Sequence, residues 1–149
     1  MVSYKSMIRY ENGRNIFNYR VVGVAFNDQS VLLHKAEGDD FWVLPGGRVE
    51  FGESAEQALI REMREEIDLK VEIVRLLWWV ENFFTYENKR YHEIALYFLM
   101  QLPDGCNYLI QPGPFQAEDG GIALILSAGC LAFAPTASIF SADFASGPP

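Results

Sequence analysis

The sequence predicts an α/β protein in which helices cover both faces of a mixed central sheet. Three observations support this prediction. Segments rich in β-branched and aromatic residues come first, a segment with helical spacing follows, and two long strand-like segments come after it. The chain has 149 residues and half of them are hydrophobic, which is enough for one domain with a substantial core.

Several strands are expected before the helix. Residues 7–10 are predicted to form a short edge strand and residues 18–26 a buried strand. Residues 30–35 would form a second strand that pairs with the buried one as a hairpin. Residues 41–44 are predicted as a short strand that ends at Pro45, because proline cannot donate to a ladder hydrogen bond.

The helix is predicted over residues 54–67. Ser54 is a suitable N-cap, and Gln57 three residues later completes a capping-box pattern. One face of this helix would bury against a sheet. The residues expected on that face are Leu59, Ile60, Met63 and Ile67.

The strands expected after the helix are longer. Residues 69–84 read as one strand, residues 85–90 as a polar turn and residues 91–101 as the returning strand. Residues 111–118, with two prolines and a glycine, are predicted to be a loop. Residues 122–126 would form a last strand.

Three glutamates of the helix carry the chemical signal. Glu62, Glu65 and Glu66 stand at i, i+3 and i+4, so their carboxylates share one face of the helix. Like charges at this spacing repel, and either water or a cation must offset the repulsion. Carboxylate oxygens suit hard cations such as Mg²⁺. The alternative is an acidic face that contacts only solvent.

The surrounding order of residues favours the cation. From Gly47 to Leu69 the chain resembles the signature of the Nudix hydrolase family, G-x5-E-x7-R-E-U-x-E-E-x-G-U, where U is a bulky aliphatic residue. Asp68 stands where the family has glycine, and aspartate tolerates the left-handed backbone that this position requires. Strands from about Tyr19 to Leu102 extend the likeness, and the segments around Phe83 and His92 are similar to small, broad-range bacterial members.

The resemblance implies a Nudix-type α/β/α sandwich and a reaction. Family members are divalent-metal-dependent pyrophosphohydrolases. They cleave a nucleoside diphosphate linked to another moiety, as in nucleoside triphosphates, ADP-ribose or nucleotide sugars, by water attack on phosphorus. The Gly47 carbonyl and the carboxylates of Glu62, Glu65 and Glu66 would hold Mg²⁺, with Mn²⁺ as a second candidate. The partner would be a small nucleotide-type substrate.

The resemblance also assigns roles within the motif. Arg61 would pair with Glu53 and hold the preceding loop against the helix. The general base that takes the proton from water could be Glu53, Glu62 or a carboxylate of the later loop, Glu118 or Asp119. Glu62 or Glu65 is the favoured base. The predicted catalytic set is therefore Glu53, Arg61, Glu62 and Glu65.

Substrate-binding residues are predicted on the strands. Arg48 follows the glycine pair and could contact phosphate or only solvent, and Arg20 could bind phosphate or pair with an acid of the fold. Glu93 is a candidate extra metal ligand, or else an exposed strand carboxylate. Trp79 and Phe83 are candidate base contacts, because aromatic rings stack on bases. Other aromatics that could stack, or belong to the core, are Trp42, Phe84, Tyr91 and Tyr97.

Composition excludes several classes of protein. The net charge of −8 argues against a nucleic-acid binder. Two distant cysteines without a CxxC pattern indicate a reduced, cytoplasmic protein. The charged N-terminal segment argues against a signal peptide, and Pro135 with few flanking basic residues argues against a membrane anchor.

The C-terminal end departs from the pattern. Residues 1–126 are predicted to form the Nudix domain, and residues 127–149 an atypical Ala/Ser/Pro-rich apolar tail where a second helix would be expected. The loss of charge after about Gly121 is consistent with a changed reading frame or with disorder. Exposed apolar surface there could promote a homodimer.

Two other function classes compete with the hydrolase. A non-catalytic Nudix-fold module would bind a nucleotide without cleaving it, but it would not need three carboxylates on one face. A structural protein with a weak Ca²⁺ site would need the alternating Asp/Asn pattern of a calcium loop, which the sequence lacks.

Overall fold

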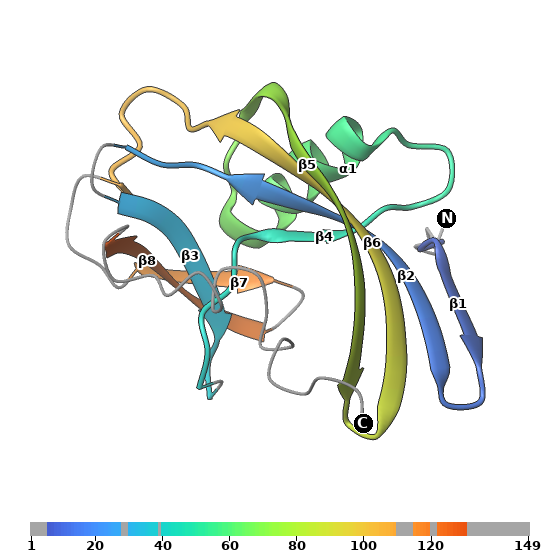
Figure 1. Ribbon diagram of the computed structural model, residues 1–149. Coiled ribbons are helices and arrows are strands. Elements are labelled where there is room, and N and C mark those ends of the chain that lie inside the picture. Colours follow the sequence, from blue (N-terminus) through green and yellow to red (C-terminus); the bar gives the residue numbers. More distant parts are fainter. Residues whose placement is uncertain (1–5, 28–29, 39, 110–114, 120–121, 131–149) are drawn as a thin grey trace, which may run out of the picture.

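The structure is a computed structural model that describes residues 6–27, 30–38, 40–109, 115–119 and 122–130. Within these residues the chain forms two sheets and one helix, α1, which packs against the larger sheet (Figure 1). The elements in chain order are β1 (Arg9–Asn12), β2 (Asn15–Val24), β3 (Ser30–Ala36), β4 (Gly46–Arg48), α1 (Ala55–Ile67), β5 (Glu72–Tyr86), β6 (Lys89–Gln101), β7 (Phe115–Asp119) and β8 (Ile122–Cys130).

The larger sheet is mixed. Its strand order is β1–β2–β6–β5, and β4 also pairs with β2. The β2–β6 pairing is parallel, whereas β2 pairs antiparallel with β1 and β4, and β5 pairs antiparallel with β6. The smaller sheet, β3–β8–β7, is antiparallel. The predicted α/β class with a mixed sheet is therefore confirmed.

The two faces of β2 belong to different hydrophobic clusters. Val21 packs with Leu59 and Met63 of α1, while its neighbour Val22 packs with Val31 of β3. Successive strand residues point to opposite faces, so β2 lies between the helix and the smaller sheet. A second helical layer is not among the described residues, and residues 131–149 of the predicted tail lie outside them.

The predicted hairpin between residues 18–26 and 30–35 is wrong. β3 instead pairs with β8 in the smaller sheet, and it meets the end of β2 only through an isolated bridge between Phe26 and Val31. Both edges of β2 are taken: β6 pairs along one, and β1 and β4 pair elsewhere on the strand. These pairings leave no edge of β2 free along most of its length for β3. The sequence of a single strand does not reveal which distant strand it pairs with.

Several further strand predictions differ from the structure: β1 covers Arg9–Asn12 where residues 7–10 were predicted, and β2 covers Asn15–Val24 where residues 18–26 were predicted. The strand predicted over residues 41–44 is wrong, because pairing with β2 begins after Pro45, at Gly46. A Cβ at Gly46 would collide with the Val21 carbonyl oxygen, so only glycine allows this close approach. The loop predicted over residues 111–118 is wrong in its second half, because residues 115–118 belong to β7 (Phe115–Asp119). The predicted last strand is confirmed and continues to Cys130, whereas the domain boundary at residue 126 stays a prediction.

The helix agrees with prediction, and the long hairpin is present with a shorter turn than the predicted residues 85–90, because β5 (Glu72–Tyr86) and β6 (Lys89–Gln101) extend into it. Ser54 is the N-cap, and both hydrogen bonds of its capping box with Gln57 are present. One detail is wrong: Ile60 is 37% exposed, because it lies beside and not on the buried stripe. The β5–β6 turn has positive φ at Glu87 and Asn88, as a two-residue hairpin turn requires. No helix in the described part of the chain is both long and apolar enough to cross a membrane.

Asp68 ends the helix in the left-handed region, with φ 51° and ψ 35°. Its charge also lies at the negative end of the helix dipole, which is unfavourable. Replacing Asp68 with glycine removes both costs, so D68G should raise the free energy of unfolding by about 1 kcal/mol. Urea denaturation would measure the change. Asparagine also tolerates the left-handed conformation but has no charge, so D68N separates the cost of the backbone conformation from the cost of the charge. A destabilised D68G protein would contradict the explanation.

Candidate active site

An open cavity of about 480 Å³ lies between the start of β4, one face of α1 and the tip of the β5–β6 hairpin. It brings together residues from both halves of the chain. The lining residues are Met7, Asn18, Arg20, Phe41, Val43, Gly46, Gly47, Arg48, Glu62, Glu66, Phe84, Tyr86, Tyr91 and Glu93. Six of the residues predicted for metal or substrate binding are among them: Arg20, Gly47, Arg48, Glu62, Glu66 and Glu93.

Gly47 and Glu62 meet at one wall of the cavity. β4 runs antiparallel to β2 with Gly47 opposite Val21, which presses the glycine backbone toward α1. A Cβ at Gly47 would overlap the Glu62 carboxylate. The position therefore needs glycine for space, and the backbone of Gly47 and the carboxylate of Glu62 are held side by side.

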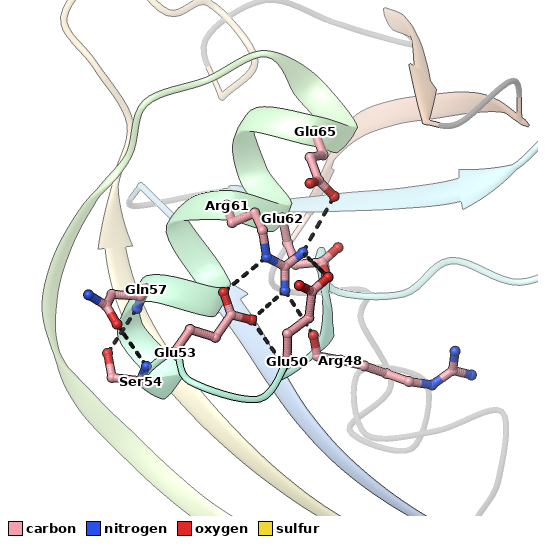
Figure 2. Close-up of polar contacts among 8 residues, drawn as sticks. All are labelled: Arg48, Glu50, Glu53, Ser54, Gln57, Arg61, Glu62 and Glu65. Carbon is pink, nitrogen blue, oxygen red and sulfur yellow. Dashed lines mark hydrogen bonds and ion pairs between the residues drawn. The ribbon is translucent and has the colours of Figure 1, made fainter. Parts of the chain in front are cut away.

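The Arg61 guanidinium ties the loop before α1 to the helix (Figure 2). Its Nε and Nη2 donate to the two carboxylate oxygens of Glu53, at 3.0 and 2.6 Å. Nη2 also donates to the Arg48 carbonyl oxygen at 3.0 Å, and Nη1 donates to Glu62 at 2.7 Å. The predicted Arg61–Glu53 contact is thus present in a bidentate form, the strongest geometry for this pair of groups.

These hydrogen bonds shift the pKa values of both Glu53 and Arg61. The hydrogen bonds from Arg61 are the main cause that holds the pKa of Glu53 below its usual range, and the Glu50 backbone N–H adds to this. The same bond to Glu53 raises the pKa of Arg61 above its usual value, against a partial opposing effect of burial. Both groups are therefore charged at neutral pH.

The three helix glutamates separate in space. Glu62 and Glu66 line the cavity, whereas Glu65 lies outside its lining and accepts a long hydrogen bond of 3.4 Å from Arg61 Nη1. Glu66 is buried, and its Oε2 lies 3.7 Å from Nδ1 of His34. Within the residues that the structure describes, no group of three His, Cys, Asp or Glu side chains converges as a metal-binding cluster. At the end of the cavity beside α1, the candidate metal ligands are the carboxylates of Glu62 and Glu66 and the backbone of Gly47; the third carboxylate of the lining, Glu93, comes from β6.

His34 was not predicted as part of this site. Burial, and then the nearby positive charge of Arg20, lower its pKa to about 4. The imidazole is therefore neutral at pH 7 and stands behind Glu66 as a packed, uncharged neighbour. The residue is 7% exposed.

Two arginines line the cavity. Arg20 on β2 and Arg48 on β4 are register partners. Burial, and then the charge of Arg20, lower the pKa of Arg48. Nη1 of Arg20 lies 4.0 Å from Oε2 of Glu93, which is 7% exposed and so is not the exposed strand carboxylate considered as an alternative.

The aromatic side chains of the cavity are partly different from those predicted. Trp79 and Phe83 do not line it and are 57% and 70% exposed. The neighbouring positions Phe84 and Tyr91 do line it, with their rings stacked at 4.8 Å. Because β5 alternates its two faces, a one-residue difference in register decides which ring enters the cavity. Two bulges in the β5–β6 pairing make that register hard to predict.

Asn18 was missed altogether. It lines the cavity, it is 3% exposed, and its residue partner on β6 is Glu93. One signal was present: an asparagine in a run of β-branched and apolar residues, two positions from Arg20 and so on the same strand face. A polar residue at an inward position of a buried strand indicates a ligand or a structural partner.

Proteins with curated names match less than half of the chain. One is the RNA pyrophosphohydrolase of Ruthia magnifica subsp. Calyptogena magnifica, 42% identical over 73 residues, which cover 48% of this chain and 41% of that protein. Another is the putative mutator protein MutT4 of Mycobacterium tuberculosis, 34% identical over 64 residues, 43% of this chain and 26% of the relative. The matched region thus spans less than half the length of these relatives.

Solved structures agree in fold. The chain is similar to a UDP-X diphosphatase, with a TM-score of 0.56 at 24% identity over 80% of this chain and 51% of the other. It is also similar to the MutT NUDIX hydrolase from Burkholderia pseudomallei, with a TM-score of 0.54 at 23% identity over 81% of this chain and 88% of the other. The NUDIX domain itself matches residues 17–119. The chain therefore belongs to the NUDIX domain family.

Proposed function

We propose that this chain is a metal-dependent hydrolase that cleaves the phosphoanhydride bond of a nucleoside diphosphate linked to another group. The observation that carries the proposal is a cavity lined by two carboxylates of α1, Glu62 and Glu66, together with two guanidinium groups, Arg20 and Arg48. A cation between carboxylates and phosphate oxygens, together with arginine donors, neutralises a diphosphate. The pyrophosphohydrolase named among the relatives supports the same bond as the target.

The residues of the cavity fit Mg²⁺. Proteins usually bind this ion through one or two carboxylates, with waters and substrate phosphates completing the coordination. Glu62 and Glu66 supply the carboxylates. The Gly47 backbone lies directly beside the Glu62 carboxylate. All of these candidate ligands are oxygens, which suits Mg²⁺ and also Mn²⁺.

Each residue has a part in the proposed reaction. The bound ion supplies charge neutralisation at the phosphoryl group and lowers the pKa of water. Arg20 and Arg48 bind the phosphate oxygens and orient the diphosphate. Glu62 or Glu65 accepts the proton from the attacking water, as favoured from the sequence, and the phosphate group on the far side of the cleaved bond leaves.

Glu53 is better suited to positioning than to proton transfer. Both of its carboxylate oxygens already accept hydrogen bonds from Arg61, and one accepts a further bond of 2.8 Å from the Glu50 backbone. Its lowered pKa makes it a weak base. We therefore assign to Glu53 and Arg61 the task of holding the Arg48 backbone, and with it β4, against the helix.

Removal of one cavity carboxylate tests the reaction. The E62Q variant should lose at least about 100-fold in kcat/KM, because each 1.36 kcal/mol of lost transition-state stabilisation is tenfold in rate. The assay is chromatographic detection of the nucleoside monophosphate formed from nucleoside triphosphates, ADP-ribose and nucleotide sugars, each with Mg²⁺, with Mn²⁺ and with chelator. Binding of Mn²⁺, followed by its spectroscopic signal, should weaken in parallel.

Glu56 provides the matched control. It is an exposed glutamate in the first turn of the same helix, so E56Q removes the same charge without touching the cavity. Its turnover and Mn²⁺ binding should equal those of the unaltered protein. A cooperatively melting protein that binds nucleotides but turns over none of the substrates, with or without metal, would instead support the non-catalytic binding module.

The positioning role predicts a different result for Arg61. R61K keeps the charge but cannot reach both Glu53 oxygens and the Arg48 carbonyl at once. The free energy of unfolding should fall by about 1–3 kcal/mol, the usual range for hydrogen bonds to charged groups. Chemical denaturation measures this. R64K, at an exposed position on the same helix, should change the free energy by less than 0.5 kcal/mol in the same assay, as is usual for surface substitutions. Equal stability of the two variants would remove the basis for the positioning role.

A further inference from the structure

One end of the cavity holds two buried hydrogen-bond acceptors that the proposed chemistry does not use. Asn18 on β2 and Glu93 on β6 are register partners, are 3% and 7% exposed, and both line the cavity. The side-chain oxygen of Asn18 is buried and has no hydrogen-bond partner in the described part of the chain. A buried polar atom without a partner costs free energy, so its presence in a cavity wall indicates a ligand that donates to it.

This end is set apart from the carboxylates of the helix. Gly47 lies opposite Val21 on β2, and Asn18 is three residues further along the same strand, which corresponds to about 10 Å. Arg20 and Arg48 lie between the two ends. A diphosphate held by the arginines and by a cation at Glu62 would therefore extend its nucleoside toward Asn18 and Glu93.

The rings beyond the acceptors suit a base. Tyr91 is two residues from Glu93 on the same face of β6, and it lines the cavity together with Phe84 and Tyr86. The Phe84 and Tyr91 rings are parallel within 3°. Aromatic faces at this place offer stacking to a flat heterocycle, an interaction that all bases can make and that does not distinguish among them.

The acceptors do distinguish among bases. A carboxylate can take two adjacent N–H groups, and guanine is the nucleobase that presents such a pair, N1–H and the N2 amino group, on its Watson–Crick edge. Adenine and cytosine place a ring acceptor next to their amino group, which a carboxylate repels. Uracil has a single N–H between two carbonyls. Guanine also carries O6 beside N1, and Arg20, 4.0 Å from Glu93, is the donor closest to that position.

We propose that Asn18 and Glu93 form a base-reading subsite selective for guanine nucleotides. The inference rests on the proposed function, because it takes the arginines and the helix carboxylates as the phosphate end of the same site. Glu93 receives N1–H and one N2 hydrogen, and the Asn18 oxygen accepts the other donor at that edge. Arg20 donates to O6, and the stacked rings beyond position the plane of the base.

Inosine nucleotides give a matched probe, since hypoxanthine differs from guanine only by the missing N2 amino group. The unaltered protein should have a kcat/KM for GTP about 10- to 100-fold above that for ITP, the range expected for a hydrogen bond to a charged group, and a larger advantage over ATP. The E93Q variant should lose most of the GTP preference, and its ITP rate should fall by a smaller factor than its GTP rate, because hypoxanthine offers Glu93 only N1–H. N18A should reduce the same ratio by a smaller factor.

The control and the contrary outcomes are distinct. E72Q, at an exposed glutamate on β5, should leave the ratio unchanged. If E93Q lowers GTP and ITP turnover equally, Glu93 serves the phosphate end and the subsite is overturned. Equal turnover of all bases by the unaltered protein also overturns it, although the hydrolase proposal survives.

Binding separates the two proposals when there is no turnover. The dissociation constants of GDP and IDP, measured calorimetrically with Mg²⁺, report the base without requiring hydrolysis. Tighter binding of GDP than of IDP, lost in E93Q, would support the subsite even if no substrate were cleaved. Equal binding of GDP and IDP would overturn it.

Discussion

The bidentate contact between Arg61 and Glu53 is the interaction on which the site depends. One guanidinium holds a carboxylate of the loop, a carbonyl of β4 and a carboxylate of its own helix at the same time. A strand of only three residues, β4, cannot fix its own position through its ladder bonds alone. The hydrogen bond from Arg61 to the Arg48 carbonyl oxygen helps to fix the position of this short strand. Every residue of β4 lines the cavity, so the shape of the cavity depends on this link between loop and helix.

Sequence predicted this centre well because its constraints are local. The capping box, the spacing of the glutamates and the Arg61–Glu53 pair all lie within 23 residues, where helix geometry fixes which side chains meet. Even the departure from the family pattern was informative: Asp68 takes the left-handed conformation that glycine would take. The glycine at position 47 also follows from a local constraint, because the Glu62 carboxylate already occupies the space that a side chain there would need.

The rest of the site was harder to predict because it depends on pairings between distant segments. Asn18 reaches Glu93 only because β2 and β6 run parallel, and no local pattern in either strand indicates that partnership. β3 was assigned to the wrong sheet for the same reason. The prediction of the aromatic residues that line the cavity was wrong by one position, since Phe84 lines the cavity and Phe83 does not. Bulges earlier in β5 set the register that decides between them.

The arrangement along β2 gives a physical reason for an acidic chain to bind an anion. With a net charge of −8, the protein as a whole repels phosphate. Arg20 and Arg48 are concentrated within the cavity, where burial reduces screening of their charge by solvent. A cation at the helix end would add positive charge on one side of them. On the other side, the Glu93 carboxyl group would accept hydrogen bonds from the donor edge of a base, as we propose. Along β2, from Val21 beside Gly47 through Arg20 to Asn18, the proposed cation, phosphate and base positions would therefore follow the order in which a nucleotide carries its groups.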